Sequence, residues 1–525
     1  MIPRVDLPFV PCPLPGGGEM ATLADVLRGR AALTPDLVAV RTDEGVTTFG
    51  ELDVTASRIA QGLAAAGVGP GSRVAVLGPN DPETLVTVHG VARSGAVPVV
   101  VNHLLVGREL AEVLVDCEPA AVLLGGHDQS ALDRLELPAS VRLVVGRAEG
   151  GERVPVPVWA QRFPAEDPGH ALPAEETALM LYTSGTTGLP KGIELTGHNL
   201  SAQYSAILLA NDMGEGSVAM APLPFFHIAG LGYAVLATLR GAELVMVQPG
   251  PGQGIADLWE EFSVTHAVVV PALLQMLVRD PAVRARSWPH LAYLTYGASA
   301  MTVELLQEAR KVFGCRFLQG YGLTETTGGV SMLSPEDHDQ GELHPWRLAT
   351  VGRAIPGSAV AVVDPITLEE LPAGQDGEIL VAGHQVMKGY WRNPQATERA
   401  MTPTGWFRTG DVGCFDDDGY LTIRDRIKDM IISGGENVYP AEVERVLAMV
   451  PGVLESAVVG IASDRWGESP YAFVVHAEGV ELTEEAVLAH CRANLAPFKV
   501  PVGVTFAGAL PKNATGKIRK HQLRS

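Results

Sequence analysis

Apolar residues recur at helical spacing near the beginning of the chain. Thr48 and Glu51 have the spacing of a capping box, in which each side chain accepts a hydrogen bond from the other residue's backbone amide. The apolar positions that follow are Phe49, Leu52, Ala56, Ile59, Ala60 and Leu63. Their intervals of three and four residues place them on one side of a helix. The pattern therefore predicts a helix from residue 48 that packs on a core.

Short apolar runs rich in β-branched residues alternate with further helical patterns. These runs occur at 73–78, 96–101, 121–125, 178–182, 266–270 and 291–297. Residues 82–93 are predicted to form a helix, and Pro271 is predicted to open another. Strands that alternate with helices in this way predict parallel sheets covered on both faces. Residues 126–175 are rich in proline, glycine and charge, so we expect them at the periphery.

The pattern changes after about residue 350, where short runs separated by turns predict antiparallel strands. Beyond the mixed-charge stretch 424–429, a compact α+β pattern follows. It contains a helix from Pro440, strands near 454–460 and 471–476, and a helix near 483–495. We therefore predict an α/β fold with two domains. The large N-terminal domain, 1–424, has layered, parallel-rich sheets and a small β-barrel-like part; a hinge at 425–428 leads to a small mobile α+β domain, 429–525.

Composition and charge exclude several classes of protein. The 525 residues are 46% hydrophobic and 19% charged, which is typical of a chain with a packed core rather than a disordered one. The formal net charge of −21 argues against nucleic acid or an anionic membrane as a partner. We see neither a signal peptide nor an uncharged run long enough to span a bilayer. The five scattered cysteines form no CxxC pair, so we expect a protein of the reducing cytosol.

One glycine- and hydroxyl-rich string follows a predicted strand directly. It reads YTSGTTGLPKG, from Tyr182 to Gly192. Glycines let backbone amides point at an anion, hydroxyl groups add donors, and Lys191 supplies a charge for a phosphate. The string does not match the Walker A pattern. It predicts a phosphate-binding loop; the alternative is a surface turn.

This string resembles the signature of the adenylate-forming superfamily, which includes acyl-CoA synthetases, adenylation domains of peptide synthetases and beetle luciferases. Further strings match in the family's order over residues 20–525. They are YGASA at 296–300, YGLTE at 321–325, WFRTGD at 406–411, DRIKD at 425–429, IISGGENVYPAEVE at 431–444 and PKNATGKI at 511–518. The resemblance implies a two-step reaction, in which a carboxylate attacks the α-phosphorus of ATP and a thiolate then displaces AMP.

The resemblance also implies sites for ATP or AMP, Mg²⁺ and coenzyme A. The implied binding residues are Thr183, Ser184, Gly185, Thr186, Thr187, Gly188, Lys191, Gly297, Ala298, Ser299, Gln319, Gly320, Tyr321, Gly322, Thr324, Asp411, Arg426, Lys428, Ser433, Gly434, Gly435 and Glu436. Tyr321 would stack on adenine and Thr324 would contact the α-phosphate. Glu325 would hold Mg²⁺, a hard cation that prefers carboxylate oxygen. Asp411 would bind the ribose hydroxyl groups.

The family's C-terminal domain works in two positions. By resemblance, Arg426 contacts the ribose or a phosphate, and Lys428 is the hinge residue. Lys517 would bridge the substrate carboxylate and the α-phosphate in the first step; the alternative is a basic tail. After a rotation of the domain, residues 433–436 would help to form the pantetheine channel.

The segment PLPFFHIAGLGY, 222–233, resembles the family's acyl pocket, with His227 as an aromatic-type gate; a core or capping histidine is the alternative. The expected lining residues are His227, Ala229, Gly230, Tyr296, Gly297, Gly322, Gly328 and Val330. Gly232, Ala298 and Gly329 are also small. Such a pocket would suit a bulky, hydrophobic carboxylic acid. The segment has no aspartate to pair an α-ammonium group, which argues against amino-acid substrates.

Two positions depart from the family pattern. Gly197 stands where the family usually has histidine, and Ala382 stands where it usually has arginine. We predict an AMP-forming acyl-CoA synthetase, with a homodimer as a candidate assembly. The alternatives are a freestanding enzyme that loads a carrier protein, a luciferase-like oxygenase, a non-catalytic adenylate-binding protein, and an enzyme of the thioester half-reaction alone, which the two departures keep open.

Overall fold

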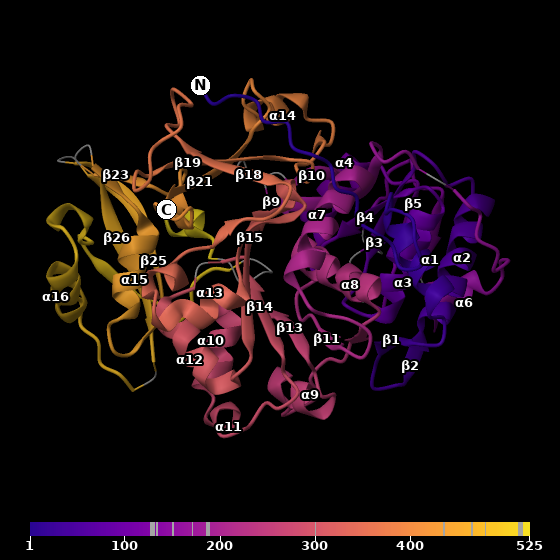
Figure 1. The fold of residues 1–525 in the computed structure, drawn as a ribbon, viewed down its shortest axis with the longest axis horizontal. Coiled ribbons are helices and arrows are strands. Elements are labelled where there is room, and N and C mark those ends of the chain that lie inside the picture. Colours follow the sequence, from indigo (N-terminus) through magenta and orange to yellow (C-terminus); the bar gives the residue numbers. More distant parts are fainter. Residues whose placement is uncertain are drawn as a thin grey trace.

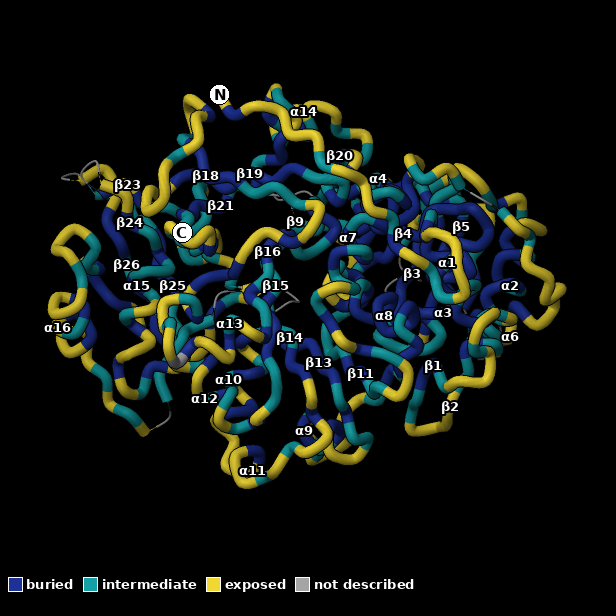
Figure 2. Tube along the Cα trace, viewed as in Figure 1, coloured by how far each residue is buried: buried dark blue, intermediate teal, exposed yellow. Residues whose placement is uncertain are grey.

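Two parallel-rich sheets with their helices form most of the molecule, and two smaller sheets and a short two-stranded pair accompany them (Figure 1). The computed structural model describes residues 1–126, 132, 135–146, 148–149, 152–170, 172–184, 190–299, 301–433, 436–463, 466–477, 479–512 and 518–524. In Figure 2 the central strands of the sheets are buried, whereas outlying elements such as α11 (Pro281–Arg284) and α16 (Glu484–Asn494) carry the exposed positions. Within these residues no helix is both long and apolar enough to cross a membrane.

The first large sheet has seven strands, which are parallel from β9 to β6 and antiparallel at β10 and β20. In spatial order they are β20 (Gly389–Tyr390), β10 (Pro190–Thr196), β9 (Thr177–Ser184), β4 (Val97–Val101), β3 (Arg73–Leu77), β5 (Ala121–Leu124) and β6 (Leu143–Val145). Alternate residues of β3 face opposite sides, as strand geometry requires. Val74 and Val76 join a core with helices α2 (Phe49–Ala65) and α3 (Pro82–Arg93), whereas Ala75 and Leu77 join one with α4 (Gly107–Cys117).

The second large sheet has nine strands and brings several predicted binding motifs together. In spatial order they are β17 (Arg353–Ala354), β16 (Gly328–Leu333), β15 (Arg316–Leu323), β14 (Tyr293–Gly297), β13 (His266–Val269), β11 (Val218–Met220), β12 (Glu243–Val245), β1 (Val38–Arg41) and β2 (Val46–Thr48). The strands from β15 to β1 run parallel, so the motifs after β14 and β15 leave the sheet at one edge. Open α/β sheets bind ligands at that edge.

A four-stranded antiparallel sheet occupies the region expected to be barrel-like. Its strands are β18 (Ser358–Val363), β19 (Gly377–Gly383), β21 (Phe407–Phe415) and β22 (Leu421–Arg426). A turn at 427–429 leads to the C-terminal α+β domain. Its strands are β23 (Ile431–Ser433), β24 (Glu436–Val438), β25 (Val453–Ser463), β26 (Gly467–His476) and β27 (Val504–Phe506), and its helices are α15 (Pro440–Ala448) and α16.

Further helices pack around the large sheets. They are α1 (Leu23–Leu33), α6 (Val156–Ala160), α7 (Gly197–Ala210), α8 (Ile228–Arg240), α9 (Ile255–Glu261), α10 (Pro271–Arg279), α11, α12 (Val303–Phe313), α13 (Pro335–Asp339) and α14 (Pro394–Ala400). A short β7 (Ala148–Glu149) pairs with β8 (Glu152–Arg153). These elements confirm the predicted α/β fold with a large N-terminal and a smaller C-terminal domain.

The helix predicted from residue 48 forms as α2, whereas the structure of the expected periphery was predicted incompletely. The Thr48 side chain accepts a hydrogen bond from the Glu51 amide at 3.3 Å, and Glu51 accepts one from the Thr48 amide at 2.8 Å. The segment 126–175 is less peripheral than expected, because β6 joins the seven-stranded sheet and Val156 and Ala160 of α6 are fully buried. Trp159 packs on α2 at Gly62, where a Cβ atom would lie 2.3 Å from its ring.

Residues 2–21, here called the N-terminal arm, run from the four-stranded sheet to α7 (Figure 1). The amide of Ile2 donates to the Leu368 carbonyl at 2.6 Å, and the Ile2 side chain is buried beside Trp406. Further along, the ring of Phe9 stacks on His198 at a centroid distance of 3.8 Å. The amide of Cys12 then donates to the Ser201 hydroxyl of α7 at 2.9 Å. The arm therefore ties two separate layers of the large domain together.

Candidate active site

The phosphate-loop string spans the β9–β10 connection. Thr183 of β9 lies opposite Lys191 of β10 in the antiparallel pair, so the two ends of the string are held side by side. Ser184 is the last residue of β9. Gly185, Thr186, Thr187 and Gly188 lie outside the described residues, and their predicted role in phosphate binding stays a prediction.

Lys191 belongs to a cluster with Tyr390 and Glu325. The ammonium nitrogen of Lys191 lies over the Tyr390 ring, 4.8 Å from its centroid, within the range of a cation–π interaction. The Tyr390 hydroxyl group donates a hydrogen bond to Glu325 Oε1 at 3.0 Å. Burial raises the pKa of the Tyr390 phenol, and the Glu325 carboxylate raises it further. Tyr390 thus stays protonated and holds the carboxylate in place.

The surroundings of Glu325 suit a magnesium ion that arrives with a nucleotide. Glu325 lies in the 3₁₀ turn Thr324–Thr326 at the end of β15, and its backbone carbonyl accepts a hydrogen bond from the Met387 amide at 2.8 Å. Among the described residues no group of three or more His, Cys, Asp or Glu side chains could hold a metal. Mg²⁺ is commonly bound through one or two carboxylates and substrate phosphates, so a single held carboxylate fits such an ion.

Tyr321, Asp411 and Arg426 form a second cluster, although they come from three strands. The Tyr321 hydroxyl group donates to Asp411 Oδ2 at 2.8 Å, and Arg426 Nε lies 2.9 Å from Asp411 Oδ1. Asp411 is opposite Arg426 in the β21–β22 ladder, which fixes their contact. Asp411 is 4% exposed, and its carboxylate raises the pKa of the Arg426 guanidinium. Burial and then Asp411 raise the pKa of Tyr321, so this phenol is a hydrogen-bond donor.

Small residues let the backbones approach closely at this edge of the nine-stranded sheet. A Cβ atom on Gly297 would lie 2.4 Å from the Gly320 carbonyl oxygen, and one on Gly322 would lie 1.7 Å from that of Gly328. Ala298 has a φ of +66°, a left-handed conformation that is unfavourable for a non-glycine residue. Ala298 and Ser299 are exposed. The YGASA string therefore turns sharply away from β14, beside the YGLTE string.

The predicted acyl-pocket residues fall into two groups. His227 precedes α8 as its N-terminal cap, Ala229 is exposed on the first turn, and Gly230 packs against the Leu223 and Pro224 carbonyls. Gly328 and the fully buried Val330 begin β16. These residues reach the edge of the sheet from α8 and β16, and their contact with an acyl group stays a prediction.

Tyr296, a predicted contact residue, has its side chain buried within the core instead. The Tyr296 ring packs among Leu306, Phe313 and Phe317. Its hydroxyl group lies 3.0 Å from His338 Nε2 and 3.3 Å from the Gln319 side-chain oxygen. In a strand, successive side chains alternate between faces, so the Tyr296 side chain points toward the helices that cover the sheet. The Tyr296 side chain therefore does not lie in the pocket wall where it was expected.

The predicted C-terminal groups are described in part. Lys428 is exposed in the turn after β22, although the first two residues of the predicted hinge, 425 and 426, still belong to β22. Ser433 is buried at the end of β23, and Glu436 is exposed at the start of β24. Gly434, Gly435 and Lys517 lie outside the described residues. The hinge, the pantetheine channel and the catalytic lysine thus stay predictions.

Both departures from the family pattern contact the N-terminal arm. A Cβ atom on Gly197 would lie 1.7 Å from the Ala21 carbonyl oxygen. Ala382 is 7% exposed and packs in an apolar cluster with Ile2, Leu380 and Trp406. A histidine at 197 would collide with the arm's backbone, and an arginine at 382 would bury a charge among apolar side chains. The two departures therefore accommodate the arm.

Gly197→Ala should destabilise the protein by about 1–3 kcal/mol, because the added methyl group meets backbone that cannot rotate away. Thermal or urea unfolding followed by circular dichroism would measure the change. Gly214→Ala is the matched control, since a Cβ atom there has no neighbour within 4 Å and the substitution should be nearly neutral. Equal midpoints for the two variants would contradict this account of the arm.

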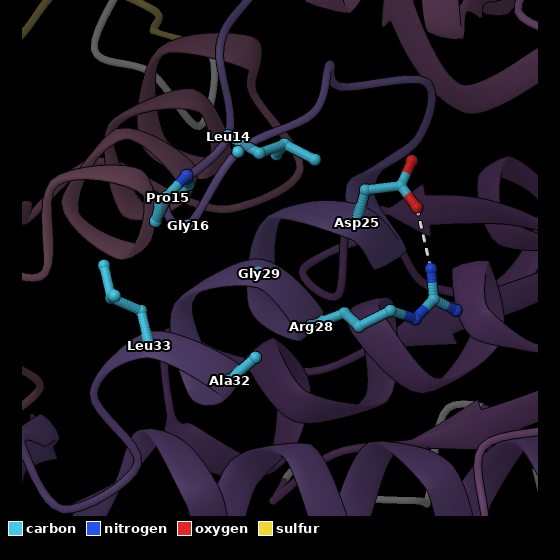
Figure 3. A pocket seen from close by; sticks show the side chains of 9 residues that line it. Leu14, Pro15, Gly16, Asp25, Arg28, Gly29, Ala32 and Leu33 are labelled. Carbon is cyan, nitrogen blue, oxygen red and sulfur yellow. Dashed lines mark hydrogen bonds and ion pairs between the residues drawn. The ribbon is translucent and has the colours of Figure 1, made fainter.

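A surface hollow of about 410 Å³ lies elsewhere, between the arm and α1 (Figure 3). Leu14, Gly16 and Leu33 line it, and Arg28 at its side is paired with Asp25 at 2.7 Å. None of the predicted nucleotide or acyl contacts lies in this hollow. We therefore assign the chemistry to the sheet edge and not to this cavity.

Comparison with known proteins agrees with this geometry. Residues 27–391 match the family model of AMP-binding enzymes, and residues 442–517 match the model of the AMP-binding enzyme C-terminal domain. The first segment contains Lys191, Tyr321, Glu325 and Tyr390, whereas Asp411 and Arg426 lie between the two segments. The chain belongs to the AMP-binding enzyme family, within the adenylate-forming superfamily.

Individual relatives match over nearly the whole chain. A feruloyl-CoA synthase of an Amycolatopsis species is 37% identical over 498 residues, covering 94% of this chain and 97% of that protein. A fatty acid–[acyl-carrier-protein] ligase of Streptomyces coeruleorubidus is 35% identical over 512 residues, covering 96% of each. The O-succinylbenzoate coenzyme A synthetase of Bacillus subtilis, solved with ATP and a magnesium ion, has a TM-score of 0.81 and 29% identity, covering 95% of this chain and 98% of that one.

Proposed function

We propose that this protein is an AMP-forming acyl-CoA ligase. In the first step a carboxylate oxygen attacks the α-phosphorus of ATP, and pyrophosphate leaves as the acyl-adenylate forms. In the second step the thiolate of coenzyme A attacks the acyl carbonyl carbon, and AMP leaves. The observation that carries the proposal is the adjacency of the two clusters. Tyr321 lies in β15 and Glu325 in the turn directly after it, and together they contact Asp411 and Tyr390, which in turn contact Arg426 and Lys191.

Each cluster has a distinct part in the first step. Asp411 would accept the ribose hydroxyl groups, while Arg426 keeps that carboxylate oriented. Lys191 and the adjoining loop would neutralise phosphate charge as pyrophosphate leaves. Mg²⁺ held at Glu325 would supply further neutralisation of the triphosphate. Tyr390 orients Glu325 for that ion.

The substrate we propose is a bulky, largely hydrophobic carboxylic acid. Gly328 and Gly329 place no side chain at the sheet edge beside the predicted acyl site, and the relatives' names include an aromatic and a fatty acyl group. The five cysteines are all free thiols, which favours a reducing compartment, so we place the reaction in the cytosol.

A second candidate function is the loading of an acyl-carrier protein. This function is favoured by the similarity to the fatty acid–[acyl-carrier-protein] ligase. The sequence identity and coverage are as high as those for several of the CoA ligases. The GGEN string favours coenzyme A. A thioester-only enzyme is the weaker alternative, because Gly197 and Ala382 have a structural reason in the N-terminal arm that needs no loss of adenylation.

Mass spectrometry of the products would separate these functions. Aliphatic, aryl and polycyclic acids would each be offered free with ATP and Mg²⁺, and also as preformed adenylates. The acceptor would be either coenzyme A or a phosphopantetheinyl carrier protein. Acyl-CoA from both feeds is the expected result. Product on the carrier protein alone would support the second candidate, and CoA esters from the adenylates alone would mean a thioester-only enzyme.

Lys517→Ala should separate the two half-reactions in the same assay. If Lys517 bridges the carboxylate and the α-phosphate, the variant loses acyl-CoA from the free acid by about 100-fold or more, yet keeps acyl-CoA formation from the adenylate. Lys520→Ala is the control for a merely basic tail, because Lys520 pairs with Glu444 at 2.8 Å within the C-terminal domain. Equal losses from both feeds would contradict the assigned role.

A further inference from the structure

Gln203, on α7, carries a buried amide group that the mechanism above does not use. The residue is 2% exposed. Neither its side-chain nitrogen nor its side-chain oxygen has a hydrogen-bond partner among the described residues. An amide offers two donors and an oxygen acceptor, and its burial without partners is unfavourable. Such a group in a native core needs a reason.

The amide of Gln203 faces the predicted acyl site. A Cβ atom on Gly328 would lie 3.2 Å from Gln203 Nε2, and one on Gly329 would lie 3.8 Å from it. Gly328 and Gly329 pair with Leu323 and Gly322 of β15, one residue before the turn that holds Thr324 and Glu325. A side chain at Gly328 would press on the amide, so the two glycines let the buried amide lie directly against this edge of the sheet.

The residues around the Gln203 amide are mostly apolar. Tyr204 and Leu200 of α7 belong to the main hydrophobic core, and the side chain of Met332 approaches Gly329, with its Cε 3.7 Å from a Cβ atom placed there. Val330, next to the two glycines, is fully buried. A pocket with such walls would bind hydrocarbon without selectivity for position. One fixed amide adds a directional contact.

We propose that Gln203 is a specificity-determining residue that hydrogen bonds an oxygen on the acyl group. The substrate class is then carboxylic acids that carry a hydroxyl or carbonyl oxygen away from the carboxylate. A hydroxyl group can both donate to the Gln203 oxygen and accept from its nitrogen, whereas an unsubstituted acid leaves the amide unpaired. This inference rests on the proposed ligase function and deepens it.

Matched pairs of acids test the inference. The probes are 4-hydroxycinnamic acid with cinnamic acid, and 10-hydroxydecanoic acid with decanoic acid, each with ATP, Mg²⁺ and coenzyme A. The wild-type protein should prefer the oxygenated member of at least one pair by about 10-fold or more in kcat/KM, because a site built for a hydroxyl group discriminates against an analogue that lacks it. Gln203→Leu should abolish or reverse that preference by improving the unsubstituted acid.

Two further variants distinguish the loss of the Gln203 hydrogen bonds from a general folding defect. Gln203→Met keeps the side-chain length without the polar atoms and should behave as Gln203→Leu does. Gln385→Leu is the control, because Gln385 is equally buried but its amide already donates to the Ser358 hydroxyl group, so its loss should change both acids of a pair equally. Equal kcat/KM for both acids in the wild type, or an equal change of both in Gln203→Leu, would overturn the proposal. Failure to activate any acid would overturn the ligase function instead.

Discussion

Replacing Glu325 with glutamine should lower the rate of acyl-adenylate formation by about 100- to 1,000-fold. The substitution keeps the shape of the side chain and its hydrogen bond from Tyr390, but it removes the negative charge that a magnesium ion requires. ATP–pyrophosphate exchange with a free acid would measure the loss. Higher Mg²⁺ concentrations should restore part of the rate.

The same variant should form acyl-CoA from a preformed adenylate at nearly the wild-type rate, because the triphosphate is absent from that step. Glu336→Gln is the matched control, since Glu336 is an exposed carboxylate paired with Arg316 on the same sheet and should have no effect on either step. Tyr390→Phe should produce a smaller loss of exchange, because it keeps the ring under Lys191 and removes the hydroxyl donor alone. Unchanged exchange in Glu325→Gln would rule out the magnesium role.

Asp411→Asn should raise the KM for ATP by about 10- to 150-fold, the range expected for the loss of hydrogen bonds to a charged group. Asparagine has the same shape, but its neutral oxygen is a weaker acceptor for ribose hydroxyl groups, and its amide nitrogen would face either Arg426 or the Tyr321 hydroxyl group. Initial rates over a range of ATP concentrations, at a saturating acid, would measure the change.

A second aspartate–arginine pair, between the residue that precedes β19 and Arg424 of β22, provides the control. Asp376 lies 3.0 Å from Arg424, but it does not contact Tyr321. Asp376→Asn should therefore leave the KM for ATP unchanged, while it perturbs another, more exposed aspartate–arginine pair. A similar rise in both variants would mean that Asp411 acts through the stability of the four-stranded sheet rather than through the nucleotide.

These predictions have the same structural basis, because the candidate site is assembled from three sheets. The seven-stranded sheet supplies Lys191 and Tyr390, the nine-stranded sheet supplies Tyr321 and Glu325, and the four-stranded sheet supplies Asp411 and Arg426. Relative movement of these layers would alter the two contacts that cross between sheets, Tyr321 with Asp411 and Tyr390 with Glu325. The N-terminal arm, which joins the four-stranded sheet to α7, restrains such movement.

Sequence motifs named most residues of the two clusters, but they did not indicate Tyr390 or Gln203. Tyr321, Glu325, Asp411, Arg426 and Lys191 stand in strings that match the family. Tyr390 stands in the string KGYW, and its contact with Glu325 spans 65 positions, so no local pattern indicated it. Gln203 stands in an ordinary helical run, where a polar residue usually faces water.

Tyr296 shows the opposite failure. Its string matches a motif at the adenine and acyl sites, which suggested that its side chain lines the pocket. Strand geometry sends alternate side chains to opposite faces, and Tyr296 happens to face the helices. A motif locates a segment of backbone, but the direction of each side chain depends on the register of the sheet.

The sequence by itself determined the local elements, the order of the domains and the family. Capping boxes and the periods of apolar residues act within a few positions, so they can be recognised in one segment at a time. The tertiary structure alone decided that Tyr390 holds Glu325, that Gln203 faces two glycines, and that Gly197 and Ala382 make room for the arm. Such contacts depend on which strand edges meet and how closely backbones approach, and these follow from the packing of whole layers.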